Sequence, residues 1–335
     1  MNQCGLYRLV PSSVWDVISI VYLLLAVLNI FLFLLTRKHS AYYLLFFLTV
    51  FKFFLLLADY RFMGNYHYMP FLVSFVYLLI PQKKTTILYT IVIFYISAGL
   101  LKLDTEWLSG SALLEPFFVG GEMLEWMLAY TIIFEVLVVL LSLSNSILLF
   151  LFSFPQIVGF HALSWHIVGY FYPCIMFSLL TSFLLFRWQW SEGKIHLQKR
   201  DSLKAGPKIF LILLFLAQVM PRVLSPNLAV DSQGRLFTLN MLDARVQCEH
   251  FSYYKGKENI YVETSSDRTD LGTRIACDPI VYTAEAAELC KNQGVEEVPS
   301  YLHSKKSTHN EWVQVLQIKN YCDKTRGVTW WGGIQ

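Results

Sequence analysis

The fold is organised around the sequence Tyr95-Ile-Ser-Ala-Gly-Leu-Leu-Lys102-Leu-Asp104-Thr-Glu106-Trp107-Leu-Ser-Gly110, which ends an apolar run that begins near Thr86. The apolar run stops at a lysine, and two acidic residues, a tryptophan and a glycine follow it. A lysine at this depth has two interpretations. Its alkyl stem can lie along apolar surface while the ammonium reaches the lipid headgroups. Alternatively, Lys102 is a catalytic amine that desolvation makes available as a base near neutral pH.

The composition of the whole chain is that of a membrane protein. Of its 335 residues, 55% are hydrophobic, 16% aromatic and 15% charged, whereas a soluble domain carries about 25% charged residues. The mean hydropathy is +0.47, so the long apolar stretches predict transmembrane helices that contact membrane lipid. The net charge of +3 gives no reason to expect a nucleic-acid partner.

Residues 1–226 are predicted to form a polytopic helical membrane domain. About eight transmembrane helices are expected, at residues 14–35, 41–58, 68–81, 86–102, 123–142, 146–163, 166–186 and 208–225. The third is short for a hydrocarbon core about 30 Å thick. The first is too long for the apolar part of a cleavable signal and has no small-residue cleavage site nearby, so we expect an anchor.

Basic residues predict the orientation of these spans. If the spans alternate, three basic clusters fall on one side: Arg37-Lys38, Lys83-Lys84, and the residues from Arg187 to Lys204. The loops on the other side contain few basic residues, and the loop from Asp104 to Glu122 is acidic. The positive-inside rule makes the clustered side cytoplasmic. Both termini and the 103–122 loop are then expected on the non-cytoplasmic side.

Residues 227–335 are polar and are predicted to form a small mixed β/α domain outside the membrane. Alternating stretches at 235–241, 259–264 and 312–319 predict strands. Residues 283–290 begin with a threonine cap, continue with glutamate and alanine, and predict one helix. The expected location of this domain is the non-cytoplasmic face.

The cysteines of the tail favour disulfides over a metal site. They have no close C-x-x-C pair, so no metal is expected, and an oxidising compartment favours disulfide bonds. Whether Cys248 pairs with Cys277 or with Cys322 is open. The chain has six cysteines, namely Cys4, Cys174, Cys248, Cys277, Cys290 and Cys322.

Ionisable side chains inside the predicted spans are further candidates. Glu135 lies near the middle of the fifth span, where a carboxylate is costly unless it is paired or neutral. Lys52 is equally anomalous, and a structural Lys52–Glu135 pair is the alternative to a functional site. His161 and His166 are five residues apart, about 140° around a helix, so they do not form a metal pair.

A polar and aromatic cluster precedes the third span. Asp59 is followed by Asn65-Tyr66-His67-Tyr68, and such residues sit naturally at the headgroup level of a membrane. His67 is expected on the same side of the membrane as Lys102. It is therefore either part of an aromatic belt or a second polar group of one site.

The pattern Y-x-x-A-G-x-x-K-L-D-x-[DE]-W, with Gly110 three residues later, resembles the signature of the vitamin K-dependent gamma-glutamyl carboxylase family. It also resembles the wider HTTM (horizontally transferred transmembrane) family that contains the carboxylase. The resemblance covers roughly residues 1–225 and implies that Lys102 takes a proton from reduced vitamin K. It implies a part in quinone handling for His67. By the same resemblance, the candidate quinol-binding residues are Asp59, Trp107, Glu135 and His161.

The resemblance has further implications for the disulfides and the substrate. A luminal cysteine of the family is tied to one in the helix of the soluble domain, which implies a bridge between Cys4 and Cys290. The implied substrates are reduced vitamin K or a related quinol, with O2 and CO2 as co-substrates, and a secreted or exported protein. The tail of this chain is far shorter than the luminal part that recognises the propeptide in the animal enzyme. Epoxidation without carboxylation therefore fits the chain better.

Two other functions are alternatives to an enzymatic one. Some HTTM proteins resemble non-catalytic membrane scaffolds or export accessories, and here the tail would bind a secreted partner. Transport is the weaker alternative, because few ionisable groups besides Lys52 and Glu135 lie within the spans and no pair of broken helices repeats in the two halves.

Overall fold

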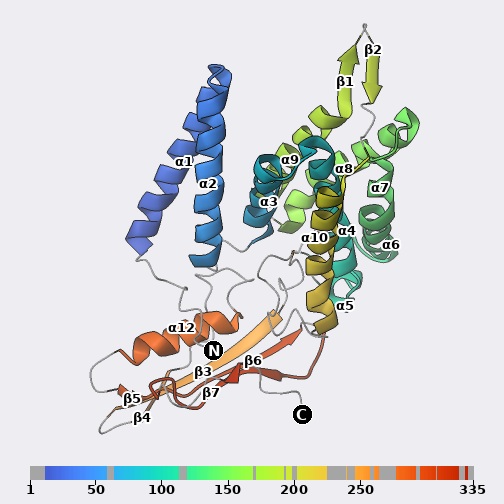
Figure 1. Ribbon diagram of the computed structural model, residues 1–335. Coiled ribbons are helices and arrows are strands. Elements are labelled where there is room, and N and C mark those ends of the chain that lie inside the picture. Colours follow the sequence, from blue (N-terminus) through green and yellow to red (C-terminus); the bar gives the residue numbers. More distant parts are fainter. Residues whose placement is uncertain are drawn as a thin grey trace.

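The computed structural model contains a helical bundle with an antiparallel sheet at one end (Figure 1). It describes residues 12–58, 64–111, 113, 119–168, 171–191, 194–197, 202–224, 239, 246–256, 260–263, 277–291, 295–306, 308–323 and 329–330. Asp59 and Cys4 lie outside these ranges.

Helices occur at every predicted span. They are α1 (Ser12–Leu34), α2 (Lys38–Ala58), α3 (Asn65–Leu79), α4 (Lys83–Leu101), α6 (Glu122–Ile133), α7 (Val139–Leu141), α8 (Ile147–Val168), α9 (Phe171–Arg187) and α10 (Ala205–Leu224). A π-helical turn, η2 (Phe134–Val138), joins α6 to α7 in one continuous helix. The short helix α5 (Thr105–Leu108) follows α4.

Five of these helical segments are long and apolar enough to cross a membrane. They are Val17–Leu34, Lys38–Leu57, Lys83–Leu101, Glu122–Leu141 and Ile147–Ser164. The apolar parts of α9 and α10 are shorter, and α3 has only 15 residues with Pro70 inside it. A membrane protein is thus supported, whereas the number of eight spans stays a prediction.

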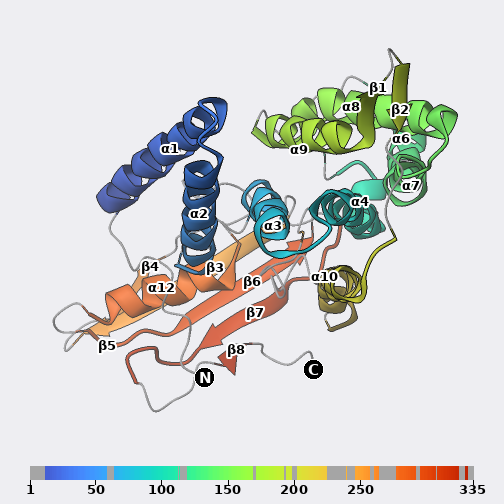
Figure 2. The same ribbon diagram turned by 45° about the horizontal axis from the view of Figure 1, so that its top comes forward.

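Helix α4 is the centre of the bundle. It packs against α3, α6, η2, α7, α9 and α10. Of the residues in its membrane-length apolar stretch, 72% are buried. By contrast, no residue in the apolar stretch Val17–Leu34 of α1 is buried, because α1 packs chiefly on α2. Figure 2 shows this pair on the far side of α3 from α4, α8 and α9. The C-terminal end of α4 is buried as well, since Ala98, Leu101 and Lys102 are 5%, 4% and 1% exposed.

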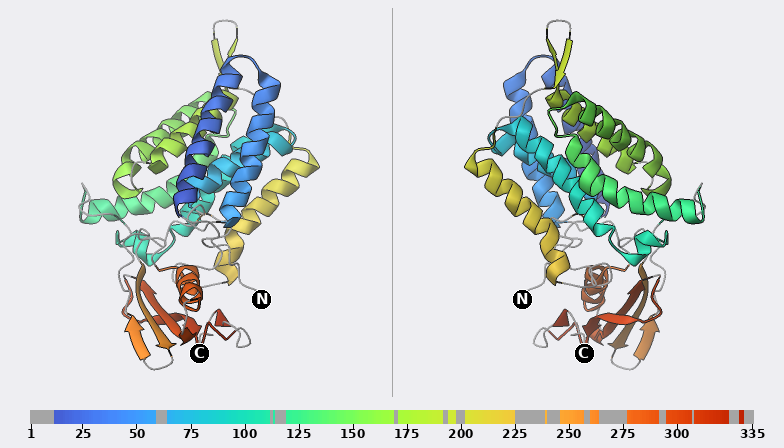
Figure 3. Two further views of the ribbon diagram at one scale, coloured as in Figure 1. Left: turned by 90° about the vertical axis from the view of Figure 1, so that its left-hand side faces the viewer. Right: turned by 90° about the vertical axis from the view of Figure 1, so that its right-hand side faces the viewer.

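A small hairpin lies at the end of the bundle opposite to the sheet (Figure 3). Its strands, β1 (Trp188–Ser191) and β2 (Lys194–Leu197), pair antiparallel. The turn between α1 and α2 lies at the same end. This segment follows the seventh predicted span, in the stretch expected to be a basic loop.

The C-terminal domain is an antiparallel sheet covered by one helix. The strands β3 (Val246–Gly256), β4 (Ile260–Glu263), β6 (Ser300–Lys306), β7 (Val313–Ile318) and β8 (Thr329–Trp330) run in the order β4-β3-β6-β7-β8, and β5 (Val295–Glu297) pairs with β3. Helix α12 (Pro279–Leu289) packs on β3 and β6. The predicted strands at 259–264 and 312–319 are thus present. The predicted helix is also present, but it begins at Pro279, so Thr283 lies inside it and the prediction that this threonine caps the helix is wrong. The predicted strand at 235–241 lies almost wholly outside the described residues.

Two disulfides hold this domain together, and one of them overturns a prediction. Cys248 is bonded to Cys277, and Cys290 is bonded to Cys322. The predicted bridge between Cys4 and Cys290 is therefore wrong. The reason is local: Cys290 follows the last residue of α12, and its Cα atom lies 5.3 Å from that of Cys322, beyond β7.

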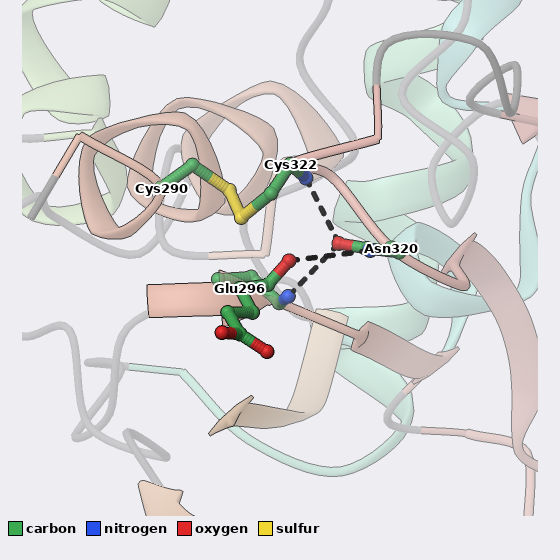
Figure 4. The surroundings of a disulfide bond; sticks show 5 residues. Cys290, Glu296, Asn320 and Cys322 are labelled. Atoms are coloured by element: carbon green, nitrogen blue, oxygen red, sulfur yellow. Dashed lines mark hydrogen bonds between the residues drawn. A yellow bond between two sulfur atoms is a disulfide. The ribbon is translucent and has the colours of Figure 1, made fainter. Parts of the chain in front are cut away.

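The surroundings of the second disulfide are fixed by one side chain (Figure 4). The amide oxygen of Asn320 accepts hydrogen bonds from the backbone N–H groups of Cys322, at 2.9 Å, and Val298, at 3.1 Å. Its amide nitrogen donates to the carbonyl oxygen of Glu296 at 3.5 Å. The loop after β7 is thereby held against the segment that links β5 to β6.

Candidate active site

Lys102 lies inside the protein at the C-terminal end of α4. Its backbone N–H group donates to the carbonyl oxygens of Ala98, at 3.2 Å, and Gly99, at 3.1 Å, so the helix ends on this residue. The residue is only 1% exposed. A lysine that extends its ammonium to the headgroups would be exposed at its tip. This interpretation of Lys102 is therefore wrong.

The partner of Lys102 is Glu135. The Nζ atom of Lys102 lies 2.5 Å from Oε2 of Glu135, and the two side chains are 1% and 3% exposed. Ionisable groups within membrane helices are costly and mark functional sites by default. Glu135 thus has the buried partner that its position within a membrane-length apolar helix requires, and that partner is Lys102.

Glu135 lies in the π-helical turn η2. Such a turn inserts one residue into an α-helix and changes the direction of the side chains around it, and it is frequent at functional sites. The backbone continues as α7 after Val138. The sequence shows no signal for this turn, since Phe134–Val138 contain neither glycine nor proline and continue the apolar run of α6 apart from Glu135.

A glycine lets the two helices approach each other. A Cβ atom built on Gly99 would lie 2.7 Å from Cγ2 of Val136 and 3.0 Å from Cβ of Glu135. Real Cβ atoms essentially never lie 2.7 Å from another heavy atom, so a larger residue at position 99 would force Val136 or the helices α4 and η2 to move. Gly99 is three residues before Lys102, and the close approach places Glu135 beside the lysine.

Aromatic rings surround the amine. Nζ of Lys102 lies 4.9 Å from the ring centre of Trp107 and 5.9 Å from that of Phe160. Trp107 is held by a hydrogen bond of 3.1 Å from Nε1 to the carbonyl oxygen of Leu128. Both rings can stabilise a positive charge on the amine through cation–π interactions.

A second polar pair lies beside the first. The hydroxyl of Tyr95 and Nε2 of His161 are 2.6 Å apart, and these residues are 3% and 1% exposed. Tyr95 precedes Lys102 by seven residues, so both lie on one face of α4. The ring of Phe160 joins the pairs, because its centre lies 5.1 Å from that of the His161 ring.

The C-terminal domain contacts the segment that follows Lys102. Asp104 caps α5, since its Oδ1 accepts a hydrogen bond of 3.1 Å from the backbone N–H of Glu106. Nζ of Lys306, at the end of β6, lies 2.8 Å from Oδ2 of Asp104 and 3.3 Å from Oε2 of Glu106. The hydroxyl of Thr308 also donates to Glu106. These partners are about two hundred residues apart in sequence, which is why the sequence did not indicate the contact.

His67 belongs to a different cluster. Its Nδ1 lies 2.9 Å from Nζ of Lys52, and its ring lies 4.3 Å from that of Tyr66. Lys52 also lies over the ring of Tyr22. The alternative pair Lys52–Glu135 is therefore wrong, because each residue has another partner.

Within the described part of the chain, no group of three or more His, Cys, Asp or Glu side chains is arranged to hold a metal ion. Comparison of the chain with family models, with curated proteins and with solved structures finds no match. The membership in a family that the Lys102 sequence implies therefore stays a prediction.

Proposed function

We propose that this protein is an integral membrane enzyme in which Lys102 deprotonates a reduced vitamin K-type quinol. The observation that carries the proposal is the buried pair of Lys102 and Glu135. A charged residue at the centre of a membrane helix costs about 2.5–3.5 kcal/mol on insertion scales. Glu135 lies inside a membrane-length helix and Lys102 at the end of another, and the π-helical turn that carries Glu135 is a feature frequent at functional sites.

The chemistry of the pair suits proton abstraction in an apolar place. A proton shared between the two groups can rest on the carboxyl group of Glu135, which leaves the amine of Lys102 neutral. The amine then takes the proton of a bound hydroxyl group. Because this proton only moves within the site, no net charge enters the membrane. The rings of Trp107 and Phe160 stabilise the ammonium that results.

The surroundings also fit an aromatic, membrane-soluble ligand. Trp107 and Phe160 lie beside the amine of Lys102 and Phe134 lies beside Phe160, so a quinol bound next to Lys102 would contact aromatic side chains. The bound quinol would supply the oxygen chemistry, giving the epoxide with O2 and, where CO2 is also used, carboxylating a glutamate of a secreted or exported protein. Lys102 and Glu135 are the catalytic residues of this proposal; a catalytic role for His67 remains a prediction that rests on the resemblance alone.

The test is epoxide formation by purified protein in nanodiscs with reduced vitamin K and O2. We expect the wild type to form epoxide, and the Lys102→Ala variant to lose activity at least 100-fold, as expected when a general base is removed. Lys83→Ala, at the other end of α4, is the matched control. Equal rates in Lys102→Ala and wild type would refute the proposal.

A non-catalytic scaffold is the second candidate. It is favoured by the outward face of the sheet, where the rings of Tyr253 and Tyr301 lie 6.4 Å apart and those of Phe251 and His303 lie 6.1 Å apart. These half-exposed rings offer a surface for a secreted or exported protein. A partner that binds the wild type and Lys102→Ala equally, but not a Tyr301→Ala variant, would support the scaffold.

A further inference from the structure

One outward face of α8 carries an amide side chain at the middle of an apolar helix. Figure 1 shows α6 and α8 on the side of the bundle opposite to α1 and α2. Gln156 lies nine residues after the start and eight before the end of the membrane-length segment Ile147–Ser164. Its neighbours on this face recur at intervals of three or four residues, and all but the glycine are more than half exposed. They are Leu148, Phe152, Gly159 and Leu163.

The amide of Gln156 uses only part of its hydrogen-bonding capacity within the chain. Its oxygen accepts from the hydroxyl of Tyr130 on α6, a residue that is 48% exposed. Its nitrogen donates to the carbonyl oxygen of Phe152 at 2.7 Å. These are the two hydrogen bonds that the described residues give the amide. Because an amide has two N–H groups and two lone pairs on its oxygen, one donor and one acceptor remain for a further partner.

A proline at the same depth adds another acceptor. Pro155 has no N–H group, so the carbonyl oxygen of Leu151 does not receive the hydrogen bond that an α-helix normally supplies. Leu151 and Pro155 are both exposed. Lipid tails have no groups that could pair with these atoms, and in membrane proteins neighbouring helices satisfy the carbonyl groups that a proline frees. The middle of α8 is thus suited to contact another helix.

Gly159 leaves room for such a helix. A Cβ atom built on Gly159 meets no atom within 4 Å, so the glycine borders open space and not a neighbouring element of the same chain. Small residues allow helices to approach each other closely in a membrane, where interhelical hydrogen bonds stabilise their association. Gly159 follows Gln156 by three residues on the same face. A helix that packs on this glycine therefore comes within reach of the amide.

We propose that this face of α8 binds the same face of a second copy of the chain within the membrane. A second copy is favoured because an amide group is self-complementary. Across a two-fold axis, Gln156 of each copy donates a hydrogen bond to the other and accepts one from it. Gly159 of each copy provides the close approach. This dimer does not depend on the proposed quinol chemistry.

The test is the oligomeric state of the full chain in lipid bilayers. Protein with one dye per chain is reconstituted into vesicles over a range of protein-to-lipid ratios, and the bleaching steps of each particle are counted. Gly159→Leu adds its side chain in open space, so the monomer stays folded while the two helices are held apart. We expect its dimer dissociation constant to be at least 10-fold above that of the wild type. Gly206→Leu is the matched control, because a Cβ atom at Gly206 also meets no atom within 4 Å.

A second variant tests the amide itself. Gln156→Leu should raise the dissociation constant about 3–30-fold, the effect of losing interhelical hydrogen bonds, and Gln156→Asn, which keeps an amide, should raise it less. A wild type that is monomeric at every ratio overturns the proposal and leaves lipid as the occupant of this face. A dimer that is equally stable in the wild type, Gly159→Leu and Gln156→Leu also overturns it, because another surface then forms the dimer.

Discussion

At the scale of single residues, the proposed activity depends on one buried pair. Lys102 and Glu135 are each almost inaccessible, and each is the other's partner. Burying such a pair is often no more stable than replacing it by apolar residues, whereas removal of one partner costs about 3–5 kcal/mol. A pair kept only for stability would therefore be a poor choice, and this difference can be measured.

Single and double replacements of the pair should separate stability from activity. We expect Lys102→Met and Glu135→Leu each to destabilise the protein by about 3–5 kcal/mol, because each leaves a buried group without its partner. The double variant should recover most of this loss and remain inactive in the epoxide assay. Thermal unfolding in nanodiscs checks the first result. An active double variant would show that the pair serves only the fold.

The sequence identifies these residues but not their pairing. Lys102 and Glu135 are recognisable because ionisable groups are rare in apolar runs. Their partners are set by packing between helices that are far apart in sequence, so the sequence suggested Lys52 as the partner of Glu135 and did not indicate Lys102. Arg187 illustrates the same limit: it was expected in a basic loop, but it is fully buried and donates to the carbonyl oxygen of Ser144.

At the scale of elements, the contact between α4 and η2 positions the pair. Gly99 leaves room for Val136 and for the backbone of the π-helical turn. Neither the turn nor the close approach follows from the periodicity of apolar residues. In a run that is apolar throughout, one inserted residue does not change the sequence pattern. The register of Glu135 relative to Lys102 is thus a tertiary property.

Replacement of Gly99 should show how sensitive this register is. Gly99→Ala should destabilise the protein by about 1–3 kcal/mol, because the added Cβ overlaps Cγ2 of Val136. It should also reduce epoxide formation, since Glu135 must move away from Lys102. Val136→Ala removes the overlapping atom, so the double variant should regain part of both losses. A Gly99→Ala variant with wild-type stability and activity would contradict the geometry.

Strand β6 shows why part of the sheet was not predicted. Its inward residues include Ser300, Ser304 and Lys306 beside Leu302, and all four are buried. A strand whose buried face is mostly polar lacks the alternation of apolar and polar residues on which prediction depends. Strand β7, by contrast, contains Val313, Val315 and Leu316 within four residues. This apolar and β-branched content is the reason why a strand was predicted at 312–319.

At the scale of the whole molecule, the C-terminal domain is connected to the site. Lys306 and Thr308 bind the acidic residues of the segment 104–106, and Trp107 follows directly and lies against Lys102. The sheet is thereby joined to α5, which lies at the end of the bundle that faces the sheet (Figure 1). Release of this contact should loosen Trp107 without unfolding the bundle.

Reversal of one charge tests this connection. Lys306→Glu places a like charge beside Asp104 and Glu106, so we expect faster hydrogen exchange in residues 104–108 and a lower epoxide rate. Adding Asp104→Lys should restore part of the contact. Lys305→Glu is the matched control, because Lys305 lies over the ring of Trp312 instead. Unchanged exchange in Lys306→Glu would contradict a docked domain.

The central claim is that Lys102 takes a proton from a bound quinol. The most direct measurement is the absorbance of the quinolate anion when reduced vitamin K is added to the protein in nanodiscs without oxygen. We predict an anion band in the wild type that is absent in Lys102→Ala. A wild type without the band, or the same band in Lys102→Ala, would contradict the account.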